Sequence, residues 1–187
     1  MVEIRWHARG GQGAKTASDF VADAAIDAGK YSQGFPDYGP ERMGAPIRAY
    51  NRISDKAVRL YCSVDHPDVV LVLDASLIEV ANVTDGATEE TKYIVNTPKS
   101  PEDIKKQLGL EDGNVYTVNA TQISIDEIGR PIPNTPMVGA LIRATEIIPI
   151  DIVFEEVKEK FSKKFSKKIV QGNINSIKRA YEEVSGV

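Results

Sequence analysis

The residues best placed to do chemistry form a glycine-rich turn near the N-terminus. The turn reads Arg9-Gly10-Gly11-Gln12-Gly13-Ala14-Lys15-Thr16. It joins an expected strand over residues 3–7 to an expected alanine-rich helix over residues 14–28. Glycine permits positive φ and close approach of a ligand, and the first N–H groups of a helix have no partner within the helix. The turn can therefore hold a phosphate or a carboxylate, although a tight turn alone would also use glycine.

Two phosphate-binding motifs do not match this turn. A Walker loop has Lys directly after its last Gly, whereas Ala14 separates Gly13 from Lys15. The dinucleotide fingerprint needs a third Gly where Thr16 stands, and an acid at the end of the second strand. The expected second strand, residues 30–35, ends without one. Nucleotide hydrolysis and hydride transfer are therefore disfavoured, and with them a small dehydrogenase.

Small or polar residues follow three expected strands where each strand ends: Asp74-Ala75-Ser76, Asn96-Thr97-Pro98 and Asn119-Ala120-Thr121. In an open α/β sheet the ligand crevice lies at the carboxyl ends of the strands, and the glycine-rich turn opens on the same edge. The segment Asn134-Thr135-Pro136 is expected to start a further helix, with Thr135 as its cap and Pro136 in the first helical position. Helix capping is the alternative role for each of these polar clusters. We predict a binding site that contains Arg9, Gly10, Gly11, Gln12, Gly13, Asn134 and Thr135.

A loop rich in proline and glycine follows the second expected strand. It reads Phe35-Pro36-Asp37-Tyr38-Gly39-Pro40-Glu41-Arg42-Met43-Gly44-Ala45-Pro46. Prolines lower the entropy lost when a loop is ordered, which favours a preformed contact surface over a solvated loop. We predict a partner interface at Tyr38, Gly39, Pro40, Glu41, Arg42 and Gly44.

The histidines and the cysteine predict neither a metal site nor a catalytic site in this chain. His7 lies at a strand end and His66 precedes a proline, and neither has a paired ligand at metal-binding spacing. Residues 111–114 contain half of a thiamine diphosphate motif without its other half, and are expected to form a turn into a strand. Cys62 is the only thiol, so the chain can build neither a disulfide nor a cysteine-ligated cluster by itself. We expect Cys62 to be buried at a strand end, and the compartment to be a reducing cytoplasm.

The rest of the chain predicts strands that alternate with helices. Residues 47–53 alternate in polarity and are expected to return through residues 54–56 to a strand over residues 58–62, as a β-hairpin. Residues 69–73 are continuously apolar, as in a central strand. Further strands are expected over residues 93–96 and 115–119, and a helix that starts at Ser100-Pro101 separates them. The expected fold is a three-layer α/β/α sandwich with a mixed, mostly parallel sheet and one β-hairpin.

Composition limits the class of protein. The 187 residues are expected to form a single domain, and a net charge of -4 argues against nucleic acid as a partner. The chain contains no apolar run near the ~20 residues of a membrane span, and we expect neither a signal peptide nor a membrane partner. Lysines between residues 158 and 168 are expected to lie on a solvated face rather than bind acidic lipid. A C-terminal helix is expected to pack through an apolar stripe of Val170, Ile174, Ile177, Tyr181 and Val184.

Three motifs in one order resemble the gamma subunit of pyruvate and related 2-oxoacid:ferredoxin oxidoreductases. They are I-R-W-H-A-R-G-G-Q-G-A-K-T, F-P-D-Y-G-P-E-R-M-G-A-P and N-T-P-M-V-G-A-L, which begin at Ile4, Phe35 and Asn134. The likeness spans nearly the whole chain. Ala8 stands where the family usually has Gly, which puts in doubt only a positive φ at this residue.

The resemblance implies a subunit of an enzyme that converts pyruvate, CoA and oxidised ferredoxin to acetyl-CoA, CO2 and reduced ferredoxin. Such chemistry uses thiamine diphosphate, Mg2+ and [4Fe-4S] clusters, which the resemblance assigns to the other subunits. The partners implied are the alpha, beta and delta subunits of the same complex, and ferredoxin. The gamma chain would be non-catalytic and inactive alone, and would dock on the complex. That it also contacts CoA is a hypothesis, which rests on the capacity of the glycine-rich turn to hold an anion.

Two alternatives to a gamma subunit of a pyruvate enzyme stay open. The first is a gamma subunit of a branched-chain 2-oxoacid enzyme that acts on 2-oxoisovalerate, because substrate choice is made on other chains. The second, from another class, is a free-standing regulatory module that binds CoA or a nucleotide. Such a module would be a monomer without a large exposed apolar patch, whereas a subunit taken from its complex exposes its interface.

Overall fold

The computed structural model describes residues 1–37 and 44–186. Within these residues one mixed sheet has the strand order β2-β3-β1-β4-β5-β6-β7. The strands are β1 (Val2–Arg9), β2 (Tyr31–Asp37), β3 (Pro46–Ser54), β4 (Val69–Val72), β5 (Lys92–Asn96), β6 (Asn114–Val118) and β7 (Ser185–Gly186).

The helices of the described chain are α1 (Ala14–Asp27), the short 3-10 helix η1 (Ala75–Ile78), α2 (Pro101–Leu108), α3 (Ala120–Ile128), α4 (Asn134–Thr145), α5 (Ile150–Ser162) and α6 (Lys167–Glu183). Helix α1 follows the glycine-rich turn, and α3 to α6 follow one another between β6 and β7. A membrane-spanning length of apolar helix is found nowhere among the described helices.

The sheet is mixed and mostly parallel, as predicted. Strands β1, β4, β5 and β6 pair in parallel, whereas β3 is antiparallel to both β1 and β2. Strand β7 is antiparallel to β6. Five strands therefore run in one direction, and only β3 and β7 oppose them. The carboxyl ends of β1, β4, β5 and β6 consequently meet at one edge.

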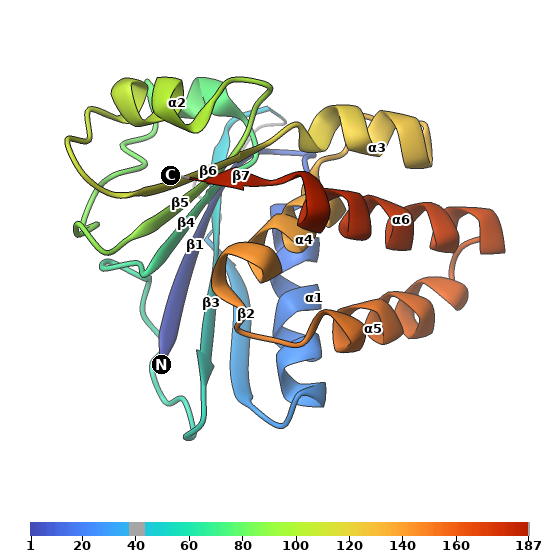
Figure 1. Ribbon diagram of the computed structural model, residues 1–187. Coiled ribbons are helices and arrows are strands. Elements are labelled where there is room, and N and C mark those ends of the chain that lie inside the picture. Colours follow the sequence, from blue (N-terminus) through green and yellow to red (C-terminus); the bar gives the residue numbers. More distant parts are fainter. Residues whose placement is uncertain (38–43, 187) are drawn as a thin grey trace.

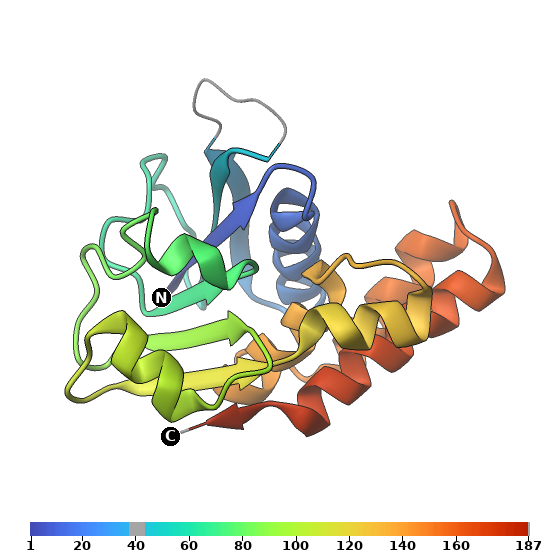
Figure 2. The same cartoon turned by 90° about the horizontal axis from the view of Figure 1, so that it is seen from above.

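Helices cover both faces of the sheet, so the predicted α/β/α arrangement is confirmed (Figure 1). Helix α2 lies on one face, while α1 and α4 pack on the other, with α5 and α6 outside them. Strand β4 contributes to both cores, because Val69 and Leu71 face one side and Val70 and Val72 the other. Figure 2 shows α3 beside α6, with the turn from α5 to α6 standing away from the sheet.

The strand predicted to pair with β3 in a hairpin is wrong. A β-hairpin is present, but it joins β3 to β2 rather than to residues 58–62. Both edges of β3 are taken by β1 and β2, which leaves no position for a third strand. The segment after β3 is instead held by Arg52, whose Nη1 donates to the carbonyl of Cys62 at 2.8 Å. The thiol of Cys62 is exposed, contrary to the prediction that it is buried.

The predicted helix signals are mostly confirmed. Ser100 Oγ accepts a hydrogen bond from Asp103 N and caps α2, whose first residue is Pro101. Helix α4 begins at Asn134, two residues before the predicted first position at Pro136. Its cap residue is Pro133, so the predicted cap at Thr135 is wrong. The apolar face of this helix is buried, and it comprises Met137, Leu141 and Ala144, followed by Ile148.

Candidate functional site

The glycine-rich turn places the N-terminus of α1 at the carboxyl edge of the sheet. Gly11 and Gly13 have φ of 97° and 83°, a region that residues with a side chain rarely adopt. Gly13 is the N-cap of α1 and supplies no capping side chain, and the first turn of the helix contains no acid. The positive end of the helix dipole is therefore open to an anion.

Space at the two glycines differs. A Cβ added at Gly11 meets no atom within 4 Å, whereas one at Gly13 would lie 2.5 Å from Asn134 Nδ2. Asn134 Nδ2 donates to the carbonyl of Gly13 at 3.5 Å, and Thr135 Oγ1 donates to Asn134 Oδ1 at 3.3 Å. The structure thus brings together the two segments predicted for one site, Gly13 from the turn and Asn134 from the start of α4. Their role in binding stays a prediction.

The guanidinium of Arg9 is held by the residues that follow β4. Its Nε lies 3.1 Å from Asp74 Oδ2, and its Nη2 donates to Ser76 Oγ at 2.8 Å. Nη1 donates to the carbonyl of Gly44 at 3.2 Å. Gln12 completes this network, because its Nε2 donates to Asp74 Oδ2 while its Oε1 accepts from Arg9 N. Arg9 therefore lies beside the turn with its charge already balanced.

Asp74 is the acid at this edge. Partial burial by itself would raise its pKa, but the hydrogen bonds from Ser76 and Gln12 and the charge of Arg9 outweigh burial and lower the pKa. The carboxylate is therefore ionised at neutral pH, and an anion bound by Arg9 has to compete with it. The sequence placed Asp74 and Ser76 at the sheet edge but did not predict their pairing with Arg9.

The polar residues at the ends of β5 and β6 form hydrogen bonds with neighbouring strand ends and helix starts at the same edge of the sheet. Asn96 Nδ2 donates to the carbonyl of Leu73 and to Thr121 Oγ1, both at 2.8 Å, and Asn96 Oδ1 accepts from Thr121 N. Asn119 Oδ1 accepts from Gln122 N and caps α3. The alternative of helix capping is therefore correct for Asn119, and Asn96 ties neighbouring strand ends together.

The predicted partner interface is only partly within the described chain. Tyr38, Gly39, Pro40, Glu41 and Arg42 lie outside the described residues. Gly44 is exposed and its carbonyl accepts the hydrogen bond from Arg9. The interface therefore stays a prediction.

A buried basic pair in β1 was not predicted as a feature. Arg5 is 2% exposed, and its Nε donates to His7 Nε2 at 3.1 Å. Its Nη2 donates to the carbonyls of Val83 and Asp85 and fixes that segment on the sheet. Burial, and then the charges of Arg5 and Arg48, lower the pKa of His7 to about 3. His7 is therefore neutral at pH 7, and its Nε2 accepts the hydrogen bond from Arg5. This pair is part of the scaffold behind the edge.

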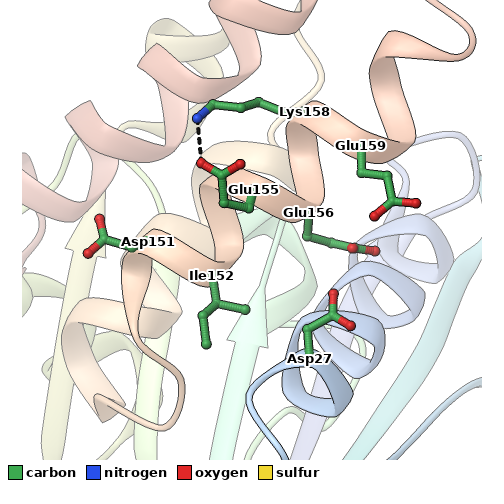
Figure 3. A pocket seen from close by; sticks show the side chains of 7 residues that line it. All are labelled: Asp27, Asp151, Ile152, Glu155, Glu156, Lys158 and Glu159. Atoms are coloured by element: carbon green, nitrogen blue, oxygen red, sulfur yellow. Dashed lines mark hydrogen bonds and ion pairs between the residues drawn. The ribbon is translucent and has the colours of Figure 1, made fainter.

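An acidic groove of about 620 Å³ lies at the other end of α1 (Figure 3). It is lined by Asp27, Asp151, Ile152, Glu155, Glu156, Lys158 and Glu159. Burial raises the pKa of Glu156, and the nearby Asp27 carboxylate raises it further. The ammonium of Lys160, whose Nζ lies 2.9 Å from Glu156 Oε1, acts to lower the pKa but does not outweigh the other two. Among residues 1–37 and 44–186 no group of three or more His, Cys, Asp or Glu side chains could hold a metal ion. The groove therefore offers an acidic surface rather than a metal site.

The comparison with known families decides the identity of the chain. The sequence profile described as "Pyruvate ferredoxin/flavodoxin oxidoreductase" matches residues 3–183. The chain belongs to this family. It is 47% identical over 182 residues to "Pyruvate synthase subunit PorC" of Thermotoga maritima, covering 97% of this chain and 94% of the relative. It is 43% identical to the "Pyruvate/ketoisovalerate oxidoreductases common subunit gamma" of Thermococcus litoralis, covering 98% and 97%.

Solved structures agree with this assignment. The crystal structure of the pyruvate oxidoreductase subunit PORC of Thermotoga maritima superposes with a TM-score of 0.89 at 43% identity, over 99% of this chain and 97% of that one. A 2-oxoglutarate:ferredoxin oxidoreductase chain from Magnetococcus marinus matches with a TM-score of 0.79 at 23% identity, over 97% of this chain and 30% of that one. At that identity it shows a shared fold alone. The resemblance inferred from the three motifs is confirmed.

Proposed function

We propose that this chain is the gamma-type subunit of a complex that oxidises pyruvate. The complex converts pyruvate, CoA and oxidised ferredoxin to acetyl-CoA, CO2 and reduced ferredoxin. The observation that carries the proposal is the relationship over almost the entire chain to pyruvate synthase subunit PorC, at 47% identity. The chain contributes docking surface rather than catalytic groups.

The cofactors are proposed to reside on partner subunits of alpha, beta and delta type. A [4Fe-4S] cluster needs four protein ligands, usually thiolates, and this chain has one cysteine, Cys62. Its residues therefore do not fit a cluster, and thiamine diphosphate with Mg2+ is likewise assigned to the partners. A reducing cytoplasm suits both such clusters and an exposed single thiol.

A second candidate is a subunit shared by a pyruvate enzyme and a 2-oxoisovalerate enzyme. It is favoured by relatives at 42–46% identity whose names contain "common subunit gamma". Affinity isolation of the tagged chain, followed by separation of the assemblies and assay with pyruvate and 2-oxoisovalerate, distinguishes the two. One assembly that prefers pyruvate supports the first proposal, and two assemblies with different substrates support the second.

The glycine-rich turn is proposed to contact a phosphate of CoA within the assembled complex. Supporting observations are the open space at Gly11, the α1 N-terminus without an acid in its first turn, and the nearby guanidinium of Arg9. The Asp74 carboxylate opposes this contact, so we expect the phosphate to lie over Gly11 and the α1 N–H groups rather than at Arg9.

Gly11→Asp in the assembled complex tests this contact. A carboxylate at the turn would repel phosphate, so we expect CoA binding to weaken by about 1–3 kcal/mol in isothermal titration. Gly109→Asp is a matched control, because Gly109 also has positive φ and open space but caps the C-terminus of α2. If Gly11→Asp and the control bind CoA equally well, the turn does not contact CoA.

A further inference from the structure

An apolar groove lies between α1 and the turn that joins α5 to α6. Its volume is about 920 Å³. Its aromatic wall is a chain of three rings: the centroids of Phe20 and Phe161 are 6.2 Å apart, and those of Phe161 and Phe165 are 5.5 Å apart. We call this feature the α1–α6 groove.

Large apolar side chains of the groove face solvent. Ile26 is 53% exposed, Phe165 48% and Ile169 36%, and all three line it. Both ribbon views show the α5–α6 turn standing away from the sheet (Figures 1 and 2), so this wall lies at the periphery of the molecule. A contiguous exposed apolar patch rimmed by charged residues marks an interaction surface.

Basic side chains outnumber acidic ones among the residues that line the groove: Arg130, Lys160, Lys163 and Lys164 against Asp19 and Asp23. Lys160 is paired with Asp23 and Glu156, and Lys163 with Glu159. Arg130 and Lys164 also line the groove and are exposed, and neither forms an ion pair with any described residue.

The start of α6 adds to this charge. Its first turn contains Lys167 and Lys168 and no acid, and Ser166 supplies no side-chain cap. The positive end of the helix dipole and the lysines therefore both favour a carboxylate at this side of the groove.

We propose that the α1–α6 groove binds an acidic segment of another subunit of the same complex. This rests on the proposed function as a gamma-type subunit. The segment places aliphatic or aromatic side chains against Phe161, Phe165 and Ile169, and Asp or Glu side chains near Arg130 and Lys164. Buried apolar contacts supply the affinity, while the charges fix the orientation and speed association.

A protein segment fits this groove better than a small molecule does. A small-molecule site buries most of its ligand and directs a few rigid polar groups at it. Here the unpaired cations stand exposed on long side chains at the rim, and the apolar residues line an outward-facing wall. This arrangement is that of a protein interface, an apolar centre with a charged margin.

Site-specific photo-crosslinking in the assembled complex identifies the occupant. Phe165→p-benzoyl-L-phenylalanine places the probe in the groove, and Tyr61→p-benzoyl-L-phenylalanine is the control, because Tyr61 is 90% exposed and does not line the groove. We expect the Phe165 probe, and not the Tyr61 probe, to link to one peptide of a partner subunit that contains both acidic and apolar residues.

Other results overturn the proposal. An intact, active complex in which the Phe165 probe links to nothing, to a second copy of this chain or to a basic peptide overturns the groove proposal alone. A preparation in which the chain has no partner subunit overturns the proposed function together with it.

Charge reversal tests whether Arg130 and Lys164 attract acidic side chains of the partner segment. We expect the double variant Arg130→Glu and Lys164→Glu to weaken assembly about tenfold at low salt, with a smaller difference from the wild type at high salt. Lys56→Glu with Lys106→Glu is the matched control, since both lysines are exposed and lie outside the groove. Equal dissociation constants for the two double variants would contradict an acidic occupant.

Discussion

His7 is buried in β1 beside Arg5, and this environment lowers its pKa from 6.5 to about 3. In the unfolded chain the imidazole binds a proton below pH 6.5, whereas in the native state it does so only near pH 3. Acid therefore favours unfolding, and stability present above pH 6.5 is lost as the pH falls towards 3. Between pH 7 and pH 5 we expect His7 to account for a loss of about 2 kcal/mol in the free energy of unfolding.

The variant His7→Gln checks this prediction. Glutamine keeps an acceptor for Arg5 Nε but cannot bind a proton, so its stability should change less between pH 7 and pH 5 in urea denaturation. His66→Gln is the control, because His66 is exposed and contacts the carbonyl of Gly86. A pH dependence for His7→Gln equal to that of the wild type would show that native His7 titrates normally.

At the scale of single residues, the sequence placed Gly13 and Asn134 in one site, and the structure brings these two residues into contact. Gly11, Gly13 and Asn134 were identified because glycine spacing and a helix start are local signals. The pairing of Arg9 with Asp74 spans 65 residues and depends on the order of β1 and β4 in the sheet. Likewise, the burial of Arg5 depends on carbonyls of a distant loop that no local pattern indicates.

Helices α4 and α6 pack closely at Gly139. A Cβ added there would lie 2.2 Å from the carbonyl oxygen of Ile177, so Gly139→Ala forces the two helices apart. We expect a loss of about 1–3 kcal/mol in the free energy of unfolding, although alanine favours a helix more than glycine does. Lys178→Ala on the exposed face of α6 should change it by less than about 0.5 kcal/mol. If both variants unfold at the same denaturant concentration, the helices tolerate the added methyl group.

The order of strands and helices was largely predicted from the sequence, because apolar runs and helix starts are local. The error concerned β3, whose partner was taken to be the next segment rather than β2 and β1. An alternating strand shows which faces it has, but it does not show which neighbours it pairs with. The wrong prediction for Cys62 follows from that error, because residues 57–62 form an irregular segment rather than a strand.

For the whole molecule, the exposed α1–α6 groove predicts how the isolated chain behaves. Without its partners it should self-associate, because apolar residues of an interface are then in contact with water. Static light scattering should give an average mass above 20.5 kDa that rises with concentration, and Ile169→Lys should reduce this rise. A monodisperse chain that binds CoA or a nucleotide by itself would instead favour the free-standing regulatory module.

The most direct test of the central claim is isolation of the tagged chain from its own cells without oxygen. Mass spectrometry identifies the chains that accompany it, and reduction of a viologen dye measures activity. We expect partner subunits that hold thiamine diphosphate and iron–sulfur clusters, and dye reduction that requires both pyruvate and CoA. Recovery of the chain alone, with no 2-oxoacid-dependent reduction in the sample, would contradict its role as a subunit of a pyruvate-oxidising complex.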